Sequence, residues 1–318
     1  MEFGFGVPTR GPLATPESLA TLVKAGEEMG FGIVSVSDHI VIPRRIASRY
    51  PYNESGEFAG GPSGECLEQL ATLSFLAGQT SSLKLLTSVM VLPHRSPVLT
   101  AKILASIDVL SNGRLIVGCG VGWMREEFEA IGAPPYDERG AVGDEYIRAF
   151  KELWTSDSPR FEGKYCSFSN ISFTPKPVQK PHPPIWIGGE SPPALRRAGH
   201  LGDAWYPIGN NPRFPVGTVE QLSEYISRVR RHAGDSGRDP SELDVAYSAG
   251  WYDDSEEQRL PTGERRVFTG SPQQIADDIK SFEAQGVGHL MLNMQSDTLD
   301  GSLARMERFA ANVKPLAA

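Results

Sequence analysis

The feature that most constrains the fold of this chain is a regular alternation between short apolar runs and longer amphipathic stretches. Eight such pairs follow one another along 318 residues. The apolar runs predict buried strands, and the longer stretches have helical spacing of their apolar residues. The predicted strands are 2–7, 33–37, 83–93, 114–122, 184–190, 203–208, 244–251 and 289–294. The predicted helices are 15–30, 66–80, 96–113, 138–154, 192–200, 218–234, 271–286 and 301–312.

This alternation favours an α/β fold, a closed (β/α)8 TIM barrel, because eight strand–helix units are the number that closes such a ring. The alternative is an open doubly wound sheet, which normally carries a glycine fingerprint after its first strand. That position here reads VPTRG, residues 7–11. We therefore expect one barrel domain spanning residues 1–318. Residues 155–183, rich in Pro and aromatic side chains, predict an insertion with room for a hairpin between the fourth helix and the fifth strand.

Charge and cysteine content exclude several classes of function. The net charge is −8 with acids and bases interspersed, so nucleic acid and anionic membranes are poor partners. Cys66, Cys119 and Cys166 are too few and too scattered for a disulfide framework or a zinc site. The sequence MEFGFGVPTR does not read as a signal peptide, and no apolar run approaches the roughly 20 residues that cross a bilayer. We expect a cytoplasmic protein that acts on a small molecule.

The second strand ends on an acid and an imidazole, Asp38 and His39, in VSVSDHIV (34–41). Active sites of such barrels lie at the carboxyl ends of the strands, so both side chains are expected on the catalytic face. A histidine oriented by a neighbouring carboxylate is a natural proton donor or acceptor. The alternative is that Asp38 caps a turn and His39 is a rim residue. We favour the catalytic interpretation.

Two glycine-rich segments follow the fourth and fifth strands. GCGVGW (118–123) is weak as a dinucleotide fingerprint, but it leaves little side chain where a flat ring could approach the backbone. IGGES (187–191) precedes a helix and predicts a phosphate seat, although its glycines also suit a tight turn. The candidate contacts are Gly118, Gly120 and Gly122 in the first segment and Gly188, Gly189 and Ser191 in the second.

Four motifs in order resemble the luciferase-like flavin and deazaflavin oxidoreductases, especially the branch assigned to coenzyme F420. They are VSDH (36–39), LLTSVMVLPHRSP (85–97), GRLIVGCGVGWMREEFEAIG (113–132) and PPIWIGGES (183–191). The resemblance covers essentially the whole chain, including the insertion. It implies a TIM barrel that binds F420 or, as the alternative, FMN.

The resemblance also implies residue roles. Asp38 would contact the cofactor ring and His39 would act on the substrate's proton. Ser88–Val89 would be a non-prolyl cis peptide bond in a bulge behind the ring. Gly188, Gly189, Glu190 and Ser191 would receive the cofactor phosphate. Members of the family are commonly dimers, so a homodimer is expected.

One departure from the family pattern bears on the cofactor. Many FMN-using members place an arginine in the loop after the fourth strand, and this chain has Val121 there. A phosphate dianion without a nearby cation is poorly held, which favours the deazaflavin, whose phosphate is an esterified monoanion. The related sugar-phosphate dehydrogenases carry a glutamate at this position, so we predict no sugar phosphate substrate.

Three functions therefore stay open. The first is hydride transfer between F420 and a small organic substrate. The second is an FMN-dependent monooxygenase that uses O2 and is supplied by a separate reductase. The third is a non-catalytic flavin-binding protein, against which Asp38 and His39 argue.

The substrate is expected among aromatic side chains in the loops 40–64, 123–137, 155–183 and 248–266. The candidate contacts are Val7, His94, Trp123, Trp205 and Trp251, with Tyr50, Tyr52, Phe58 and Tyr136 adding aromatic character. No histidine pair has metal-binding spacing, so no metal is predicted. Glu126 and Glu127 are expected to begin a solvated helix.

Overall fold

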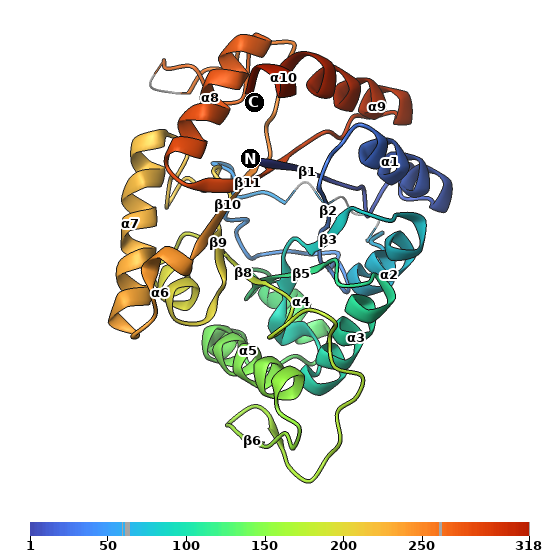
Figure 1. Ribbon diagram of the computed structural model, residues 1–318, viewed down its shortest axis with the longest axis vertical. Helices are drawn as coiled ribbons and strands as arrows, with labels where there is room; N and C mark the ends of the chain where they lie inside the picture. The colour runs from blue at the N-terminus through green and yellow to red at the C-terminus, as the bar shows by residue number, and fades with distance from the viewer. Residues whose placement is uncertain (59, 61–63, 261–262, 318) are drawn as a thin grey trace.

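A closed ring of parallel strands forms the centre of the protein (Figure 1). The computed structural model describes residues 1–58, 60, 64–260 and 263–317. The ring contains β1 (Glu2–Gly6), β2 (Ile33–Val36), β3 (Lys84–Thr87), β4 (Met90–Val91), β5 (Leu115–Gly120), β8 (Ile185–Gly188), β9 (Ala204–Tyr206), β10 (Asp244–Ala249) and β11 (Val287–Leu292). β3 pairs with both β2 and β5, which closes the ring. Because β3 and β4 are two parts of one interrupted strand, the ring has eight positions, and the predicted (β/α)8 barrel is confirmed.

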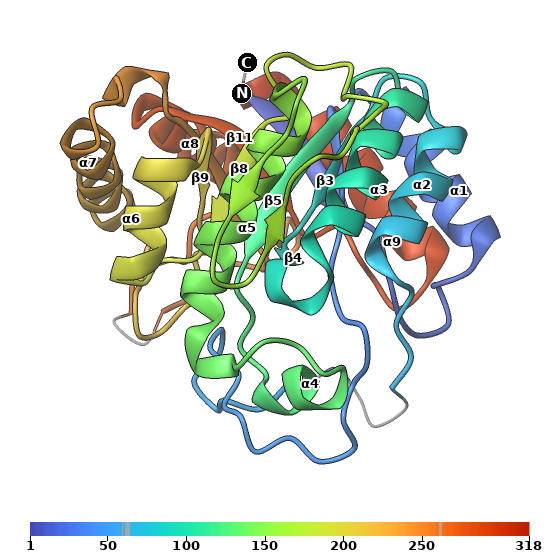
Figure 2. The same ribbon diagram turned by 90° about the horizontal axis from the view of Figure 1, so that it is seen from below.

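Helices surround this ring on its outside (Figure 1). They are α1 (Pro16–Glu28), α2 (Gln69–Gln79), α3 (Pro97–Leu110), α5 (Arg139–Thr155), α6 (Pro192–Leu201), α7 (Val219–Asp235), α8 (Pro272–Ala284), α9 (Leu299–Arg308) and α10 (Lys314–Ala317). The short α4 (Arg125–Ala130) lies instead at one end of the barrel (Figure 2). Local signals fix several of their starts: Thr15 Oγ1 accepts from the Ser18 N–H, and Ser271 and Gln274 form a capping box. None of the helices in the described part of the chain is long and apolar enough to cross a membrane.

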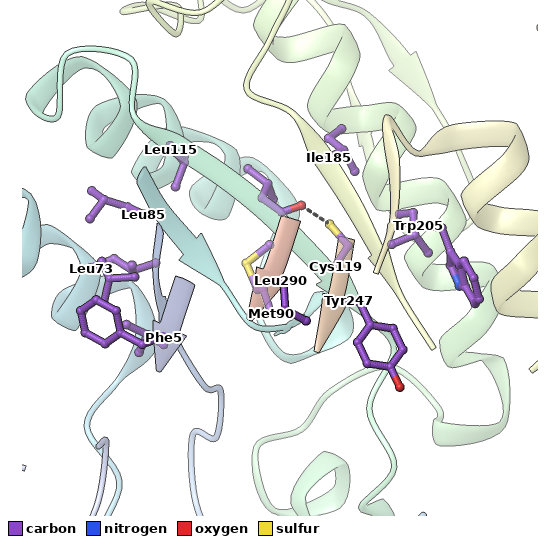
Figure 3. Packing of buried hydrophobic residues seen from close by; sticks show 14 of the residues in the cluster. Phe5, Leu73, Leu85, Met90, Leu115, Cys119, Ile185, Trp205, Tyr247 and Leu290 are labelled. Carbon is purple, nitrogen blue, oxygen red and sulfur yellow. Dashed lines mark hydrogen bonds between the residues drawn. The ribbon is translucent and has the colours of Figure 1, made fainter. Parts of the chain in front are cut away.

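Alternate residues of each strand point to two different cores. The inside of the barrel is filled by Ile33, Leu86, Ile116, Trp186, Ala204, Tyr206, Ala246 and Met291. The larger core lies between the sheet and the helices (Figure 3). On β9, Ala204 and Tyr206 point inward, so Trp205 points outward and stacks on Tyr225 of α7 with ring centroids 6.1 Å apart.

The third predicted strand, 83–93, is interrupted where β3 gives way to β4. The peptide bond Ser88–Val89 between them is cis, as predicted. Val89 lies against two glycines of neighbouring strands: a Cβ on Gly120 would stand 2.6 Å from Val89 Cγ2, and one on Gly188 would stand 3.1 Å from Cγ1. Glycine at position 120 is therefore required for the path of the chain at Val89.

The insertion at 155–183 contains the predicted hairpin, β6 (Phe161–Glu162) paired antiparallel with β7 (Ser167–Phe168). It extends beyond α5 in Figure 1. The prediction that this segment walls the substrate site is wrong. A loop that follows a helix emerges at the amino ends of the strands, whereas the site of such a barrel lies at the carboxyl ends.

Candidate active site

A cavity of about 1010 Å³ lies at the carboxyl ends of the strands. Figure 2 shows α4 and the loop between β2 and α2 together at one end of the barrel, and residues of both line this cavity. The structure gathers most predicted site residues there: Asp38, His39, Ser88, Val89, His94, Gly120, Gly122, Trp123, Gly188, Gly189, Glu190 and Ser191. None of residues 155–183, all of them described, belongs to this lining, and 248–266 contributes only Ser248 among its described residues. Residues 59, 61–63 and 261–262 of the predicted loops lie outside the described residues.

Four predicted contacts lie away from the cavity. Trp205 faces the outer core, where its indole N–H donates to Gly189 O at 2.9 Å. Trp251 is buried, with its indole N–H on Val267 O at 2.8 Å. Val7 is buried in the outer core. Gly118 packs against the backbone of Thr87, and the Thr87 hydroxyl donates to the Gly118 carbonyl. These four residues stabilise the fold and do not line the cavity.

His39 is held by a carboxylate from a distant part of the chain. Its Nδ1 lies 2.8 Å from Glu127 Oε2. The other oxygen of Glu127 accepts the N–H groups of Ile40 at 2.7 Å and Val41 at 3.3 Å. Glu127 is only 1% exposed, so its expected place on a solvated helix is wrong. With Nδ1 directed at the carboxylate, Nε2 is left as the ring nitrogen for the cavity.

Glu126, the neighbour of Glu127, also serves this loop instead of solvent. Its Oε1 accepts the N–H groups of Ala47 at 2.7 Å and Ser48 at 2.9 Å. Helix α4 thus fixes two points of the loop after β2, and of Glu126 and Glu127 only Glu127 contacts the histidine.

Asp38 does not orient its sequence neighbour. Its carboxylate accepts two hydrogen bonds from Arg95, at 2.8 and 2.7 Å, and one from the Val91 N–H at 2.8 Å. Arg95 also donates to Glu68, at 2.6 and 3.1 Å. Asp38 therefore ties the end of β2 to the segment after β4. A contact between Asp38 and the cofactor stays a prediction.

His94 lies on the other side of Glu127. Its Nδ1 is 3.8 Å from Glu127 Oε1, beyond hydrogen-bonding distance, and its ring packs edge-on against Phe128 at 4.8 Å. Both ring nitrogens are buried without a hydrogen-bond partner among the described residues. Burial lowers the pKa of His94, which keeps the imidazole neutral at physiological pH.

An aromatic group covers His39. Phe58 lies 5.2 Å from the imidazole and 5.3 Å from Trp123, and Tyr50 lies 5.1 Å from Trp123, all between ring centroids. These rings come from the loop after β2 and the segment after β5. They place an apolar wall beside the one ring nitrogen that His39 presents to the cavity.

The predicted phosphate seat has fewer backbone donors than expected. α6 begins Pro192–Pro193, which removes two N–H groups from its first turn. Glu190 is buried, and its carboxylate accepts the Ile208 N–H at 2.7 Å and the Asn211 amide at 2.8 Å. Burial raises the pKa of Glu190 to about 7. Both oxygens of this side chain are used by the protein, and a contact of the Glu190 segment with the cofactor phosphate stays a prediction.

Three arginines line the cavity around this seat. Arg197 is ion-paired with Asp144 and donates to Gly140 O at 2.9 Å. Arg139 lies 4.0 Å over the ring of Tyr136 and donates to its carbonyl. Arg213 is exposed and lies 5.3 Å over the ring of Phe214. Among the described residues, no group of three His, Cys, Asp or Glu side chains is placed to hold a metal ion.

Comparison with known proteins places this geometry in a family. Residues 1–260 match the family model described as luciferase-like monooxygenase. The chain belongs to this family. An uncharacterized Mycobacterium tuberculosis protein (strain H37Rv) is 31% identical over 303 residues, which are 92% of this chain and 93% of that protein. The FMNH(2)-dependent dimethylsulfone monooxygenase of Pseudomonas putida is 35% identical over 183 residues, 57% of this luciferase-like chain. The match spans 48% of that enzyme, about half its length.

Solved structures share the barrel. The F420-dependent tetrahydromethanopterin reductase of Methanopyrus kandleri superposes with a TM-score of 0.76 at 18% identity, covering 100% of this chain and 99% of that one. The monooxygenase RslO1 of Streptomyces bottropensis gives 0.77 at 23% identity, covering all of both chains. At these identities the likeness shows the fold alone.

Replacing Glu127 tests its hold on His39. With a carboxylate as acceptor, neutral His39 carries its proton on Nδ1; in Glu127→Gln the side-chain amide can donate instead, so we expect the proton to move to Nε2. Nitrogen-15 NMR of histidine-labelled protein reads the tautomer directly. Glu126→Gln is the matched control, because Glu126 binds the same loop without contacting His39. An unchanged His39 spectrum in Glu127→Gln would contradict the assignment.

The buried Glu190 predicts a pH dependence of stability. Its pKa of about 7 lies above the ordinary 4.5, so the folded protein keeps a proton that the unfolded chain loses. The free energy of unfolding therefore falls as the pH rises from about 4.5 to about 7, by about 3 kcal/mol from this group. Glu190→Gln should lack this fall, and the exposed Glu224→Gln should keep it. Urea denaturation at about pH 5 and about pH 8 measures both; an equal fall in wild type and Glu190→Gln would refute the prediction.

Proposed function

We propose that this luciferase-like protein is an oxidoreductase that transfers a hydride between coenzyme F420 and a small organic substrate, with His39 moving the accompanying proton. The observation that carries the choice of F420 is the charge around the phosphate seat. Val121 stands where FMN-using members carry an arginine, and it lies against Gly143 next to Arg197. Arg197 is already neutralised by Asp144. The buried Glu190 adds no positive charge.

A dianionic terminal phosphate would need more than this seat offers. Charge-assisted hydrogen bonds to phosphate are strong when an unpaired guanidinium supplies them. The deazaflavin phosphate is an esterified monoanion and needs less compensation. Arg139 and the exposed Arg213 line the same part of the cavity and are the residues that would hold it. The donor set thus fits F420 better than FMN.

The cavity also fits a flat ring. Its volume of about 1010 Å³ lies at the upper end of ordinary ligand sites, enough for a cofactor and a small substrate together. Gly120, Gly188 and Gly189 leave backbone uncovered on one wall, with Val89 between them. Ser88 Oγ lies 3.0 Å from the Tyr206 hydroxyl, and this hydrogen bond holds the Ser88 side chain beside Val89.

The chemistry divides between cofactor and protein. F420, when bound, supplies or accepts a hydride at its ring. The chain's own part is to hold a substrate atom near His39 and to move a proton through Nε2 while Glu127 binds Nδ1. Phe58 and Trp123 limit the access of water to the imidazole.

The alternative is an FMN-dependent monooxygenase fed by a separate reductase. One observation favours it, the 35% identity to the FMNH(2)-dependent dimethylsulfone monooxygenase over 57% of this chain. The same His39 and Glu127 would then serve proton transfer in an oxygen-using reaction.

Titration of the purified protein with F420 and with FMN separates the two. Trp123 lines the cavity, so intrinsic tryptophan fluorescence should report binding. We expect F420 to bind at least about tenfold more tightly than FMN, equivalent to about 1.4 kcal/mol. Tighter binding of FMN would overturn the F420 proposal and support the monooxygenase.

Restoring the arginine tests the charge argument itself. Val121→Arg adds a guanidinium beside the seat, and a dianion gains more from it than a monoanion does. We expect FMN affinity to rise about tenfold relative to F420 affinity. Val121→Leu controls for size and should leave the ratio unchanged. An equal gain for both cofactors in the same titration would contradict our account of the seat.

A further inference from the structure

Arg10, in the wall of the active-site cavity, is a half-buried cation with no ion-pair partner among the described residues. It follows β1 and lines the cavity. Its Nη1 atom is buried and makes no hydrogen bond, and no ion pair joins Arg10 to any residue of the described part of the chain. The contact found is with an aromatic ring: the guanidinium carbon lies 5.0 Å from the centroid of Phe58. Arg49 of the loop after β2, by contrast, donates to Glu54 O at 2.6 Å.

Such a group costs stability unless a ligand completes it. A guanidinium has five N–H donors, and a buried donor left without a partner destabilises the fold, more so when it belongs to a charged group. The carboxylates near this side of the cavity are already used, Asp38 by Arg95 and Glu127 by His39. The positive charge of Arg10 is therefore available to something that enters the cavity.

The cofactor phosphate is poorly placed to be that ligand. Around the ring, β1 and β8 are four strands apart in either direction, through β2, β3 and β5 or through β11, β10 and β9. The phosphate seat follows β8, so Arg10 lies across the barrel from it. Arg10 instead lies on the same side of the cavity as His39, which is the substrate side.

We propose that the substrate is an organic anion, a carboxylate or a similarly compact oxyanion, whose charged group binds Arg10. Its apolar part packs on Phe58 and Trp123. Phe58 contacts both Arg10 and His39, at 5.0 and 5.2 Å, so one aromatic ring connects the charge-binding group with the proton-transfer group. The inference rests on the proposed function, whose substrate class it names.

Matched probes of equal shape test this class. Binding of phenylacetate and phenylacetamide, and of benzenesulfonate and benzenesulfonamide, is measured by tryptophan fluorescence in the protein alone and with F420 added. We expect each anion to bind at least about tenfold better than its amide. Arg10→Met should abolish this preference, and Arg10→Lys should keep part of it. Arg45→Met removes the same charge from an exposed site of the loop after β2 and should leave the preference intact.

Two further readouts separate the possible failures. Arg10→Met should unfold at the same or a higher urea concentration than wild type, because the unsatisfied guanidinium is gone. Equal binding of anion and amide, or no binding of any probe at about 10 mM, would overturn the proposal. So would a loss of F420 affinity in Arg10→Met, which would assign Arg10 to the cofactor. A failure of F420 binding with the anion preference intact would instead refute the cofactor assignment alone.

Discussion

The buried carboxylate of Glu127 connects the histidine to the loop that covers it. One oxygen lies 2.8 Å from His39 Nδ1 and the other accepts the Ile40 N–H at 2.7 Å. His39 follows β2 and Glu127 follows β5, so this interaction joins two loops that belong to non-adjacent strands of the barrel. Without it, a buried N–H would lose its partner and the imidazole would be free to turn. The orientation of the proton-transfer group and the shape of the cavity therefore depend on the same side chain.

The barrel could be predicted because its signals are local. Each strand and helix is defined by the periodicity of its own residues, and each cap by residues three positions apart. The alternation along a strand would also have placed Trp205 correctly, since its neighbours Ala204 and Tyr206 fill the barrel interior. The misplacement of 155–183 has a similar cause: a loop after a helix and a loop after a strand lie at opposite ends of the barrel.

The partner of His39 could not be predicted in this way. Asp38 is adjacent in sequence, but successive residues at a strand end point in different directions, and its carboxylate turns to Arg95. Glu127 is 88 positions from His39 and lies in a six-residue helix that was expected here, but as one facing solvent. The signal present in the sequence was only the segment REEFEA, whose two adjacent glutamates read as a solvated surface. Folding converts both into internal acceptors of the same loop.

The charges of the cavity divide between its two sides. On the side of β8, Arg197 is paired with Asp144 and Glu190 is buried among its own donors, which leaves Arg139 and the exposed Arg213 as the cations that line the cavity there. On the side of β1, Arg10 has no ion-pair partner in the described part of the chain, and Phe58 contacts both it and His39. A neutral substrate would leave Arg10 unsatisfied in the complex as well as in the free protein. An anionic one would satisfy it and, by fixing one end of the molecule, would limit which carbon can approach the hydride position of the cofactor.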